Sequence, residues 1–107
     1  MVLGVDYYPE QWPEAMMEAD LQRMVELGCN VIRIGEFAWH RMEPREGAYD
    51  FSFFDRVIAM AKRKGLRVIF GTPTATPPAW LIHKHPDILS QFETGAPRAF
   101  GGRHGYC

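Results

Sequence analysis

Two similar junctions most constrain what this chain can fold into. Residues 27–32 (LGCNVI) and 64–69 (KGLRVI) each place a glycine between an amphipathic stretch and a β-branched run. A glycine at that point suits the left-handed conformation that ends many helices, and the run that follows suits a strand buried on both faces. Gly28 and Gly65 lie 37 positions apart, a period typical of a repeated strand–helix unit.

The apolar pattern around these junctions predicts a β-α-β-α-β order. Short apolar runs favour strands, and apolar residues that recur at three- and four-residue intervals favour helices. The predicted strands are residues 2–5, Val31–Ile34 and 66–70. The predicted helices run from Pro13 to Gly28 and from about Asp50 to Gly65, with Asp50 or Ser52 as the capping residue of the second. The fold class is therefore α/β.

The remaining third of the chain is predicted to be mostly loop. Residues 72–78 (TPTATPP) form a rigid loop, because the Pro-Pro pair cannot continue a helix. One or two helical turns are expected over residues 79–83, and a small hairpin is expected to pair residues 88–92 with 98–100.

Composition excludes several classes of function. With 107 residues and 47% hydrophobic content, the chain is at most one ordinary domain with enough apolar material for a core. A net charge of −1 offers no basic surface for nucleic acid and no polybasic membrane patch. Two cysteines do not make a disulfide framework, and Cys29 is expected to be a reduced core thiol. Because no targeting or membrane-spanning segment is evident, a cytoplasmic location is expected.

The loops after the three predicted strands are dense in polar and aromatic groups, whereas the helix-to-strand junctions are plain. In parallel α/β folds the functional site lies at the carboxyl ends of the strands. Aromatic rings beside carboxylates and guanidinium groups suit sugars, because rings stack on the C–H faces and charged groups bind the hydroxyls. The residues are Tyr7, Tyr8, Glu10 and Trp12; Glu36, Trp39, His40 and Arg41; Thr72, Thr74 and Thr76; and Arg103, His104 and Tyr106.

Other patterns carry less information. Arg33, at the end of the second strand, is either part of a site or a strand-end arginine paired with a carboxylate. No glycine-rich phosphate loop occurs, so nucleotide binding has little support. His83 and His85 flank Lys84 and are weak candidates for metal ligands.

Four segments resemble the start of a glycoside hydrolase family 42 β-galactosidase. They are residues 4–13 (GVDYYPEQWP), 30–55 (NVIRIGEFAWHRMEPREGAYDFSFFD), 71–81 (GTPTATPPAWL) and 100–107 (FGGRHGYC). The resemblance implies that residues 1–107 are part of a catalytic (β/α)8 TIM barrel, with about three of its eight units. It also implies a retaining enzyme with two catalytic glutamates that hydrolyses terminal β-D-galactosides.

The resemblance assigns no catalytic residue within this chain, because the acid/base and nucleophilic glutamates would both lie beyond residue 107. This fragment is therefore expected to be inactive alone. Arg33 resembles the arginine that hydrogen-bonds the nucleophile, and Arg103 resembles one that contacts galactose. Cys107 resembles the first cysteine of a structural zinc cluster found in some members, which would need downstream ligands. Glu36 and Trp39 are expected either to support the site or to be purely structural.

The resemblance also implies a set of partners and leaves two alternatives open. It implies a β-galactoside or galacto-oligosaccharide substrate, no required organic cofactor, and a full-length parent that forms homo-oligomers. One alternative is an enzyme of the same clan with another sugar preference, and the other is a non-catalytic carbohydrate-binding or interaction module. As a partial barrel, the chain is expected to expose an inner sheet face, with Val31 and Val68 among its residues.

Overall fold

The computed structural model describes residues 1–98, which fall into two units. The first unit holds Met1–Glu36 and Phe51–Gly71. The second holds Phe37–Asp50 and the described residues from 72 onward. Because the chain crosses between them more than once, neither unit is a continuous segment.

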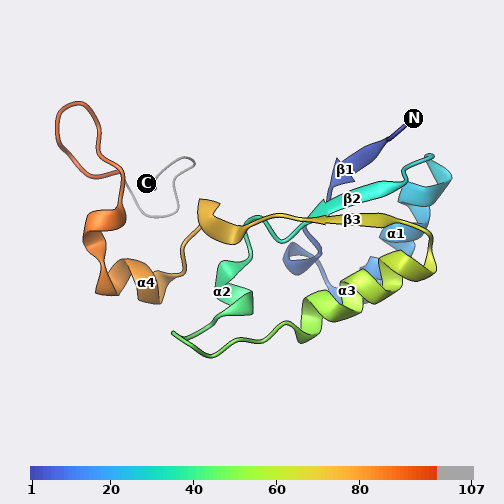
Figure 1. The fold of residues 1–107 in the computed structure, drawn as a ribbon, viewed down its shortest axis with the longest axis horizontal. Coiled ribbons are helices and arrows are strands. Elements are labelled where there is room, and N and C mark those ends of the chain that lie inside the picture. The colour runs from blue at the N-terminus through green and yellow to red at the C-terminus, as the bar shows by residue number, and fades with distance from the viewer. Residues whose placement is uncertain (99–107) are drawn as a thin grey trace. The chain divides into compact units, whose positions relative to one another are not determined.

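A parallel three-stranded sheet forms the centre of the first unit (Figure 1). Strands β1 (Gly4–Asp6), β2 (Val31–Ile34) and β3 (Arg67–Phe70) follow one another across the sheet in the order β1-β2-β3. The parallel pairing confirms the predicted α/β class. It arises because β1 and β2 are each followed by a helix, α1 (Met17–Glu26) or α3 (Ser52–Arg63), that returns the chain to the same end of the sheet.

Two helices cover one side of this sheet (Figure 1). Helix α1 (Met17–Glu26) follows two short 3-10 turns, Pro9–Gln11 and Glu14–Met16, and α3 (Ser52–Arg63) follows the long loop after β2. Their apolar stripes and the inner residues of β2 form the core, whose fully buried members include Leu21, Ile32, Ile34, Phe54 and Val57. The ring of Phe54 also makes edge-to-face contacts with Phe53 and Phe70.

The strand register decides which residues belong to the open face of the sheet. Ile32 is fully buried and pairs with Val68, so Val68 lies on the helix-covered side. Val31 and Arg33 alternate with Ile32 and therefore lie on the opposite side. The prediction for the open face is right for Val31 and wrong for Val68, because a shift of one residue along a strand moves a side chain to the other face.

The helix ends confirm the glycine prediction but not the cap prediction. Gly28 and Gly65 have φ values of 87° and 76°, which place both in the left-handed region. Helix α3 begins at Ser52, with Phe51 in the N-cap position and no side-chain cap hydrogen bond. Neither Asp50 nor Ser52 therefore occupies the N-cap position itself, although both lie next to it. Cys29, just after the first junction, is a free and buried cysteine, as predicted.

The second unit consists of short helices and turns. It contains α2 (Trp39–Met42), a 3-10 turn at Pro73–Ala75, α4 (Ala79–Lys84) and a further turn at Pro86–Ile88. Helix α4 matches the predicted helical turns, whereas α2 lies where only loop was expected. A bridge joins Gln91 to Pro97, so the turn of the predicted hairpin is present, while most of the second predicted strand lies outside the described residues.

None of the helices within residues 1–98 combines the length and the apolar composition that crossing a bilayer requires.

Candidate active-site face

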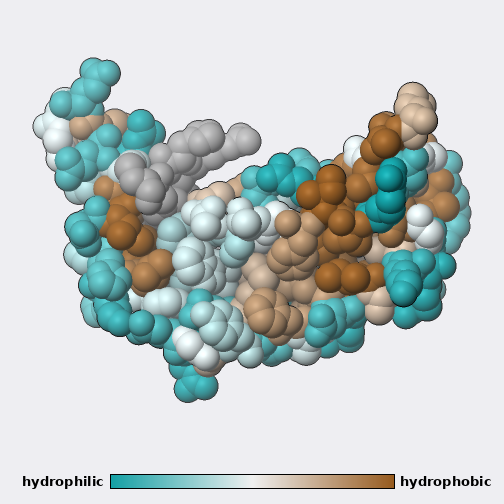
Figure 2. Space-filling view, viewed as in Figure 1, coloured by the Kyte–Doolittle hydropathy of each residue, from teal (hydrophilic) through white to brown (hydrophobic). Residues whose placement is uncertain are grey.

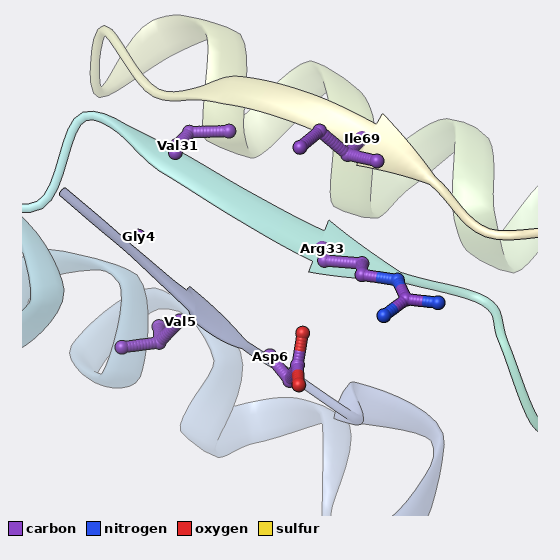
Figure 3. Close-up of a pocket in the computed structure, with 6 residues that line it drawn as sticks. All are labelled: Gly4, Val5, Asp6, Val31, Arg33 and Ile69. Carbon is purple, nitrogen blue, oxygen red and sulfur yellow. The ribbon is translucent and has the colours of Figure 1, made fainter. Parts of the chain in front are cut away.

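Polar side chains cluster at the carboxyl ends of β1 and β2. The register places Asp6 beside Arg33, and both side chains lie on the open face of the sheet (Figure 3). The N–H of Tyr7 donates to the carbonyl oxygen of Arg33 at 2.8 Å, which continues the pairing one residue beyond β1. The two strands therefore present a carboxylate and a guanidinium group side by side, as the sequence pattern predicts for this end of the sheet.

Arg33 is held by an ion pair with Glu36. Its Nη2 atom lies 2.9 Å from Oε1 of Glu36, and the two side chains are 43% and 22% exposed. Gly35 makes the turn between them with a φ of 85°. A side chain on Gly35 would in addition lie 2.9 Å from the ring of Phe70, so the turn requires glycine. The structure thus contains the strand-end ion pair that was one of the two interpretations of Arg33.

The end of β3 helps to fix the position of Glu36. The N–H of Gly71 donates to the carbonyl oxygen of Ile34 at 2.8 Å. A Cβ atom on Gly71 would lie 3.2 Å from the Cβ of Glu36, which is tighter than ordinary packing. The backbone at Gly71, just after β3, therefore runs close to Glu36 and leaves no room there for a larger residue.

The two tyrosines after β1 differ in their surroundings. Tyr7 is 6% exposed, and its hydroxyl donates to Oδ2 of Asp20 in α1 at 3.3 Å. Burial, followed by the nearby Asp20 carboxylate, raises the pKa of Tyr7. Tyr8 is less buried, and its pKa is raised by burial first and then by Asp6 and Glu36. Tyr7 thus anchors the loop to α1, whereas Tyr8 lies in the electrostatic field of the face residues.

In the second unit, Trp39 is bonded to Glu43. The indole N–H of Trp39 donates to Oε2 of Glu43 at 2.7 Å, and the N–H of Gly47 donates to Oε1 at 2.8 Å. The indole N–H of Trp80 donates to the backbone carbonyl oxygen of Glu43 at 2.9 Å. Glu43 is only 5% exposed, and its pKa is lowered chiefly by the bond from Trp39 and then by that from Gly47.

Glu43 is the important residue that the sequence reasoning missed. Its signal was the four-residue spacing from Trp39, which brings two side chains together on one turn of helix. The hydrogen-bonding end of Trp39 is committed to this contact. Trp39 therefore has a clear structural role in its unit, which was one of the two interpretations given for it.

The described residues do not fit a zinc centre. Residues 1–98 contain no group of three or more histidine, cysteine or acidic side chains placed to hold a metal ion. His83 and His85 are exposed and belong to no such group. Arg103 and Cys107, the expected galactose and zinc contacts, lie outside the described residues.

Comparisons with known proteins identify the family of the chain. The chain matches the glycoside hydrolase family 42 sequence model, described as β-galactosidase, over residues 6–107. It is 48% identical over 106 residues to a β-galactosidase of Thermus thermophilus and 41% identical over 107 residues to one of Haloferax lucentense. These alignments cover 99% and 100% of this chain but only 16% of each relative.

Solved structures give the same result. The fold matches the β-galactosidase of the psychrophile Marinomonas ef1 with a TM-score of 0.91 at 44% identity, covering 99% of this chain and 16% of that one. It matches the β-galactosidase of Halorubrum lacusprofundi with a TM-score of 0.92 at 39% identity, covering 100% of this chain and 16% of that one. The three parallel strands thus correspond to the N-terminal part of a TIM barrel. The chain belongs to the glycoside hydrolase family 42 β-galactosidases.

Proposed function

We propose that this chain is part of a β-galactosidase that hydrolyses terminal non-reducing β-D-galactosides by retaining double displacement. The observation that carries the proposal is the Arg33–Glu36 pair at the carboxyl end of β2, within a segment that matches the family over residues 6–107. In TIM-barrel enzymes the reacting groups gather at this end of the strands. We infer that Arg33, which Glu36 holds at this end, binds a carboxylate supplied by another strand.

In the proposed reaction Arg33 acts on the nucleophile. A fixed guanidinium group beside a carboxylate lowers its pKa and keeps it ionised, hence nucleophilic, at neutral pH. The acid/base and nucleophilic glutamates, both beyond residue 107, would stand ~5–5.5 Å apart. One attacks the anomeric carbon while the other protonates the leaving oxygen, and water then hydrolyses the galactosyl-enzyme.

Several further parts of the proposal rest on the family resemblance. Arg103 contacts the galactose, and no organic cofactor takes part. Cys107 joins a structural zinc cluster only when further cysteines are supplied from beyond residue 107. The complete enzyme is a homo-oligomer.

Two proteins test the proposed function. The first is the 107-residue chain alone, which we expect to release no chromophore from a chromogenic β-galactoside above a mock-purified control. The second is a chimera in which this chain replaces the matched segment of the Thermus thermophilus β-galactosidase, and which we call the barrel chimera.

The barrel chimera is expected to hydrolyse the β-galactoside, and to do so faster than the matching α-arabinoside and β-fucoside. A folded chimera without activity would contradict the proposed role of the chain. Faster hydrolysis of either of the other two sugars would instead favour an enzyme of the same clan with a different preference. Hydrolysis by the chain alone would show that the catalytic carboxylates lie within residues 1–107.

A further inference from the structure

One row of residues crosses the three strands close to their carboxyl ends. The register pairs Asp6 of β1 with Arg33 of β2, and Arg33 with Ile69 of β3. All three residues line an open hollow of about 240 Å³ on the face of the sheet that the helices leave uncovered (Figure 3). In TIM-barrel enzymes this face points into the barrel, and the functional groups gather at the carboxyl ends of the strands. The row therefore lies at the end of the sheet where such enzymes bind their substrates.

Among the residues that the structure describes, the carboxylate of Asp6 has no hydrogen-bond or ion-pair partner. Arg33, its neighbour in the row, forms its ion pair with Glu36 instead. A carboxylate that is enclosed without a hydrogen-bond donor or a counter-charge is strongly unfavourable. Inside a barrel, Asp6 must therefore receive a donor, either from a bound ligand or from a part of the enzyme outside the described residues.

The backbone leaves space beside this carboxylate. Gly4 lies two residues before Asp6, on the same face of β1, and has no side chain. A side chain at this position would collide with Val31, so the close approach of β1 and β2 requires glycine. Hydrophobic surface gathers over the strands (Figure 2). A few polar groups in an otherwise apolar hollow are typical of a site for a small molecule.

The chemistry of the row fits an uncharged sugar. An ionised carboxylate only accepts hydrogen bonds, and a guanidinium group only donates them. A sugar hydroxyl can donate to the first and accept from the second. A hydrogen bond from a hydroxyl to a carboxylate is roughly twice as strong as one between neutral groups. Because Asp6 and Glu36 would both repel an anionic ligand, the row favours a neutral ligand that is rich in hydroxyl groups.

We propose that Asp6 is a substrate-binding residue whose carboxylate accepts a hydrogen bond from one hydroxyl group of the galactosyl ring. Asp6 makes and breaks no covalent bond in this role. It orients the sugar and favours sugars that carry the hydroxyl group. The inference rests on the proposed function. Loss of the contact should weaken binding by about tenfold or more, the usual effect of removing a hydrogen bond to a charged group.

The experiment measures binding to the barrel chimera with ligands that are not hydrolysed. The ligands are methyl β-D-thiogalactoside and its 2-, 3-, 4- and 6-deoxy analogues, and isothermal titration calorimetry gives each dissociation constant. Asp6→Ala should bind the parent thiogalactoside about tenfold or more weakly than the unsubstituted chimera does. For the one analogue that lacks the bound hydroxyl group, the two proteins should agree within about twofold, because the contact is already absent.

Further variants separate this role from a structural one. Asp6→Asn keeps the shape and one acceptor oxygen but loses the charge, so we expect a smaller loss of affinity. The matched control is Asp55→Asn, the same change at an exposed position in α3, which should change affinity by no more than about twofold. The urea midpoint of Asp6→Ala should equal that of the unsubstituted chimera. If another part of the enzyme bonded to Asp6, the substitution would leave a donor unpaired and the midpoint would fall.

The outcomes distinguish the role of Asp6 from the proposed function. Equal affinity of Asp6→Ala and the unsubstituted chimera for the parent thiogalactoside would overturn the role of Asp6, even in a chimera that hydrolyses a β-galactoside. An equal loss of affinity with all four deoxy analogues would overturn it as well. A chimera that shows the selective loss but hydrolyses no β-galactoside would uphold the role of Asp6 and contradict the proposed function. An unsubstituted chimera that binds no thiogalactoside would overturn both.

Discussion

Each of the two units of this protein is stabilised internally by a different kind of interaction. In the first, apolar side chains of α1, β2 and α3 are completely buried, and backbone hydrogen bonds join three parallel strands. In the second, the carboxylate of Glu43 accepts hydrogen bonds from Trp39 and Gly47, and the backbone carbonyl oxygen of Glu43 accepts one from Trp80. The first unit is a hydrophobic scaffold, and the second is organised by specific polar contacts.

This difference predicts which substitutions each unit tolerates. A hydrophobic core loses stability in proportion to the volume removed, and many apolar residues of the right size can fill it. A buried carboxylate that serves several donors admits few replacements, because each bond depends on the geometry of the others. We therefore expect the first unit to tolerate apolar replacements of similar size and the second to tolerate few changes at Glu43. Substitutions on the candidate active-site face should change activity more than stability.

The largest effect on stability is expected from the core of the first unit. Phe54→Ala in the barrel chimera should lower the free energy of unfolding by about 3–5 kcal/mol, because it removes a fully buried ring and leaves a cavity. Ile58→Ala, four residues further along α3 and 37% exposed, is the matched control. Urea unfolding followed by far-ultraviolet circular dichroism measures both. Similar losses for the two variants would show that α3 does not pack as described.

A slightly smaller change in free energy is expected on the candidate active-site face, where it should affect the activation barrier and not the stability. Arg33→Lys in the barrel chimera should raise the activation barrier by about 2–4 kcal/mol, because lysine keeps the charge but loses the planar fork that orients a carboxylate. The urea midpoint should hardly change, since a half-exposed ion pair contributes little to stability. Arg63→Lys is the control. Wild-type turnover in Arg33→Lys would show that Arg33 only forms a structural ion pair with Glu36.

The second unit should respond to pH through Glu43. Its pKa is lowered in the folded chain, so the ionised form stabilises the fold above the ordinary carboxyl pKa. That contribution is lost as the pH falls through the lowered value. Glu43→Gln should abolish this pH-dependent contribution to the free energy of unfolding. It should destabilise the chimera less than Phe54→Ala does.

Tryptophan fluorescence during an acid titration measures the change, because Trp39 and Trp80 both bond to Glu43. The matched control is Glu46→Gln, which removes an exposed carboxylate paired with Lys84. If both variants shift the acid transition equally, the Glu43 contacts do not organise this unit.

The smallest effect is expected at a helix end. Gly28→Ala should cost about 1–2 kcal/mol of stability, because an alanine side chain is strained at a φ of 87°. A Cβ at this position meets no atom within 4 Å, so the cost is conformational and not steric. Gly28→Asn should lose less, since asparagine tolerates the left-handed region. Urea midpoints compare the two, and equal losses would point to a cause other than backbone conformation.

The sequence by itself determined the order of the strands and the long helices. Those elements depend on apolar periodicity and on glycines at helix ends, which are local properties of the chain. The long motifs likewise indicated the family. The polar residues that follow β1 and β2 were predicted from the same local order, because parallel strands end at one edge of the sheet.

Only the tertiary structure decided which residues face each other. Val68 lies on the helix-covered side and Arg67 on the open side because of the register with β2, which no local pattern reveals. The pairing of Arg33 with Glu36 needs the turn at Gly35 and the close approach of Gly71. Glu43 became important only when Gly47 and Trp80 were brought to it. Contacts of this kind join residues through the folded backbone, and spacing along the chain does not encode them.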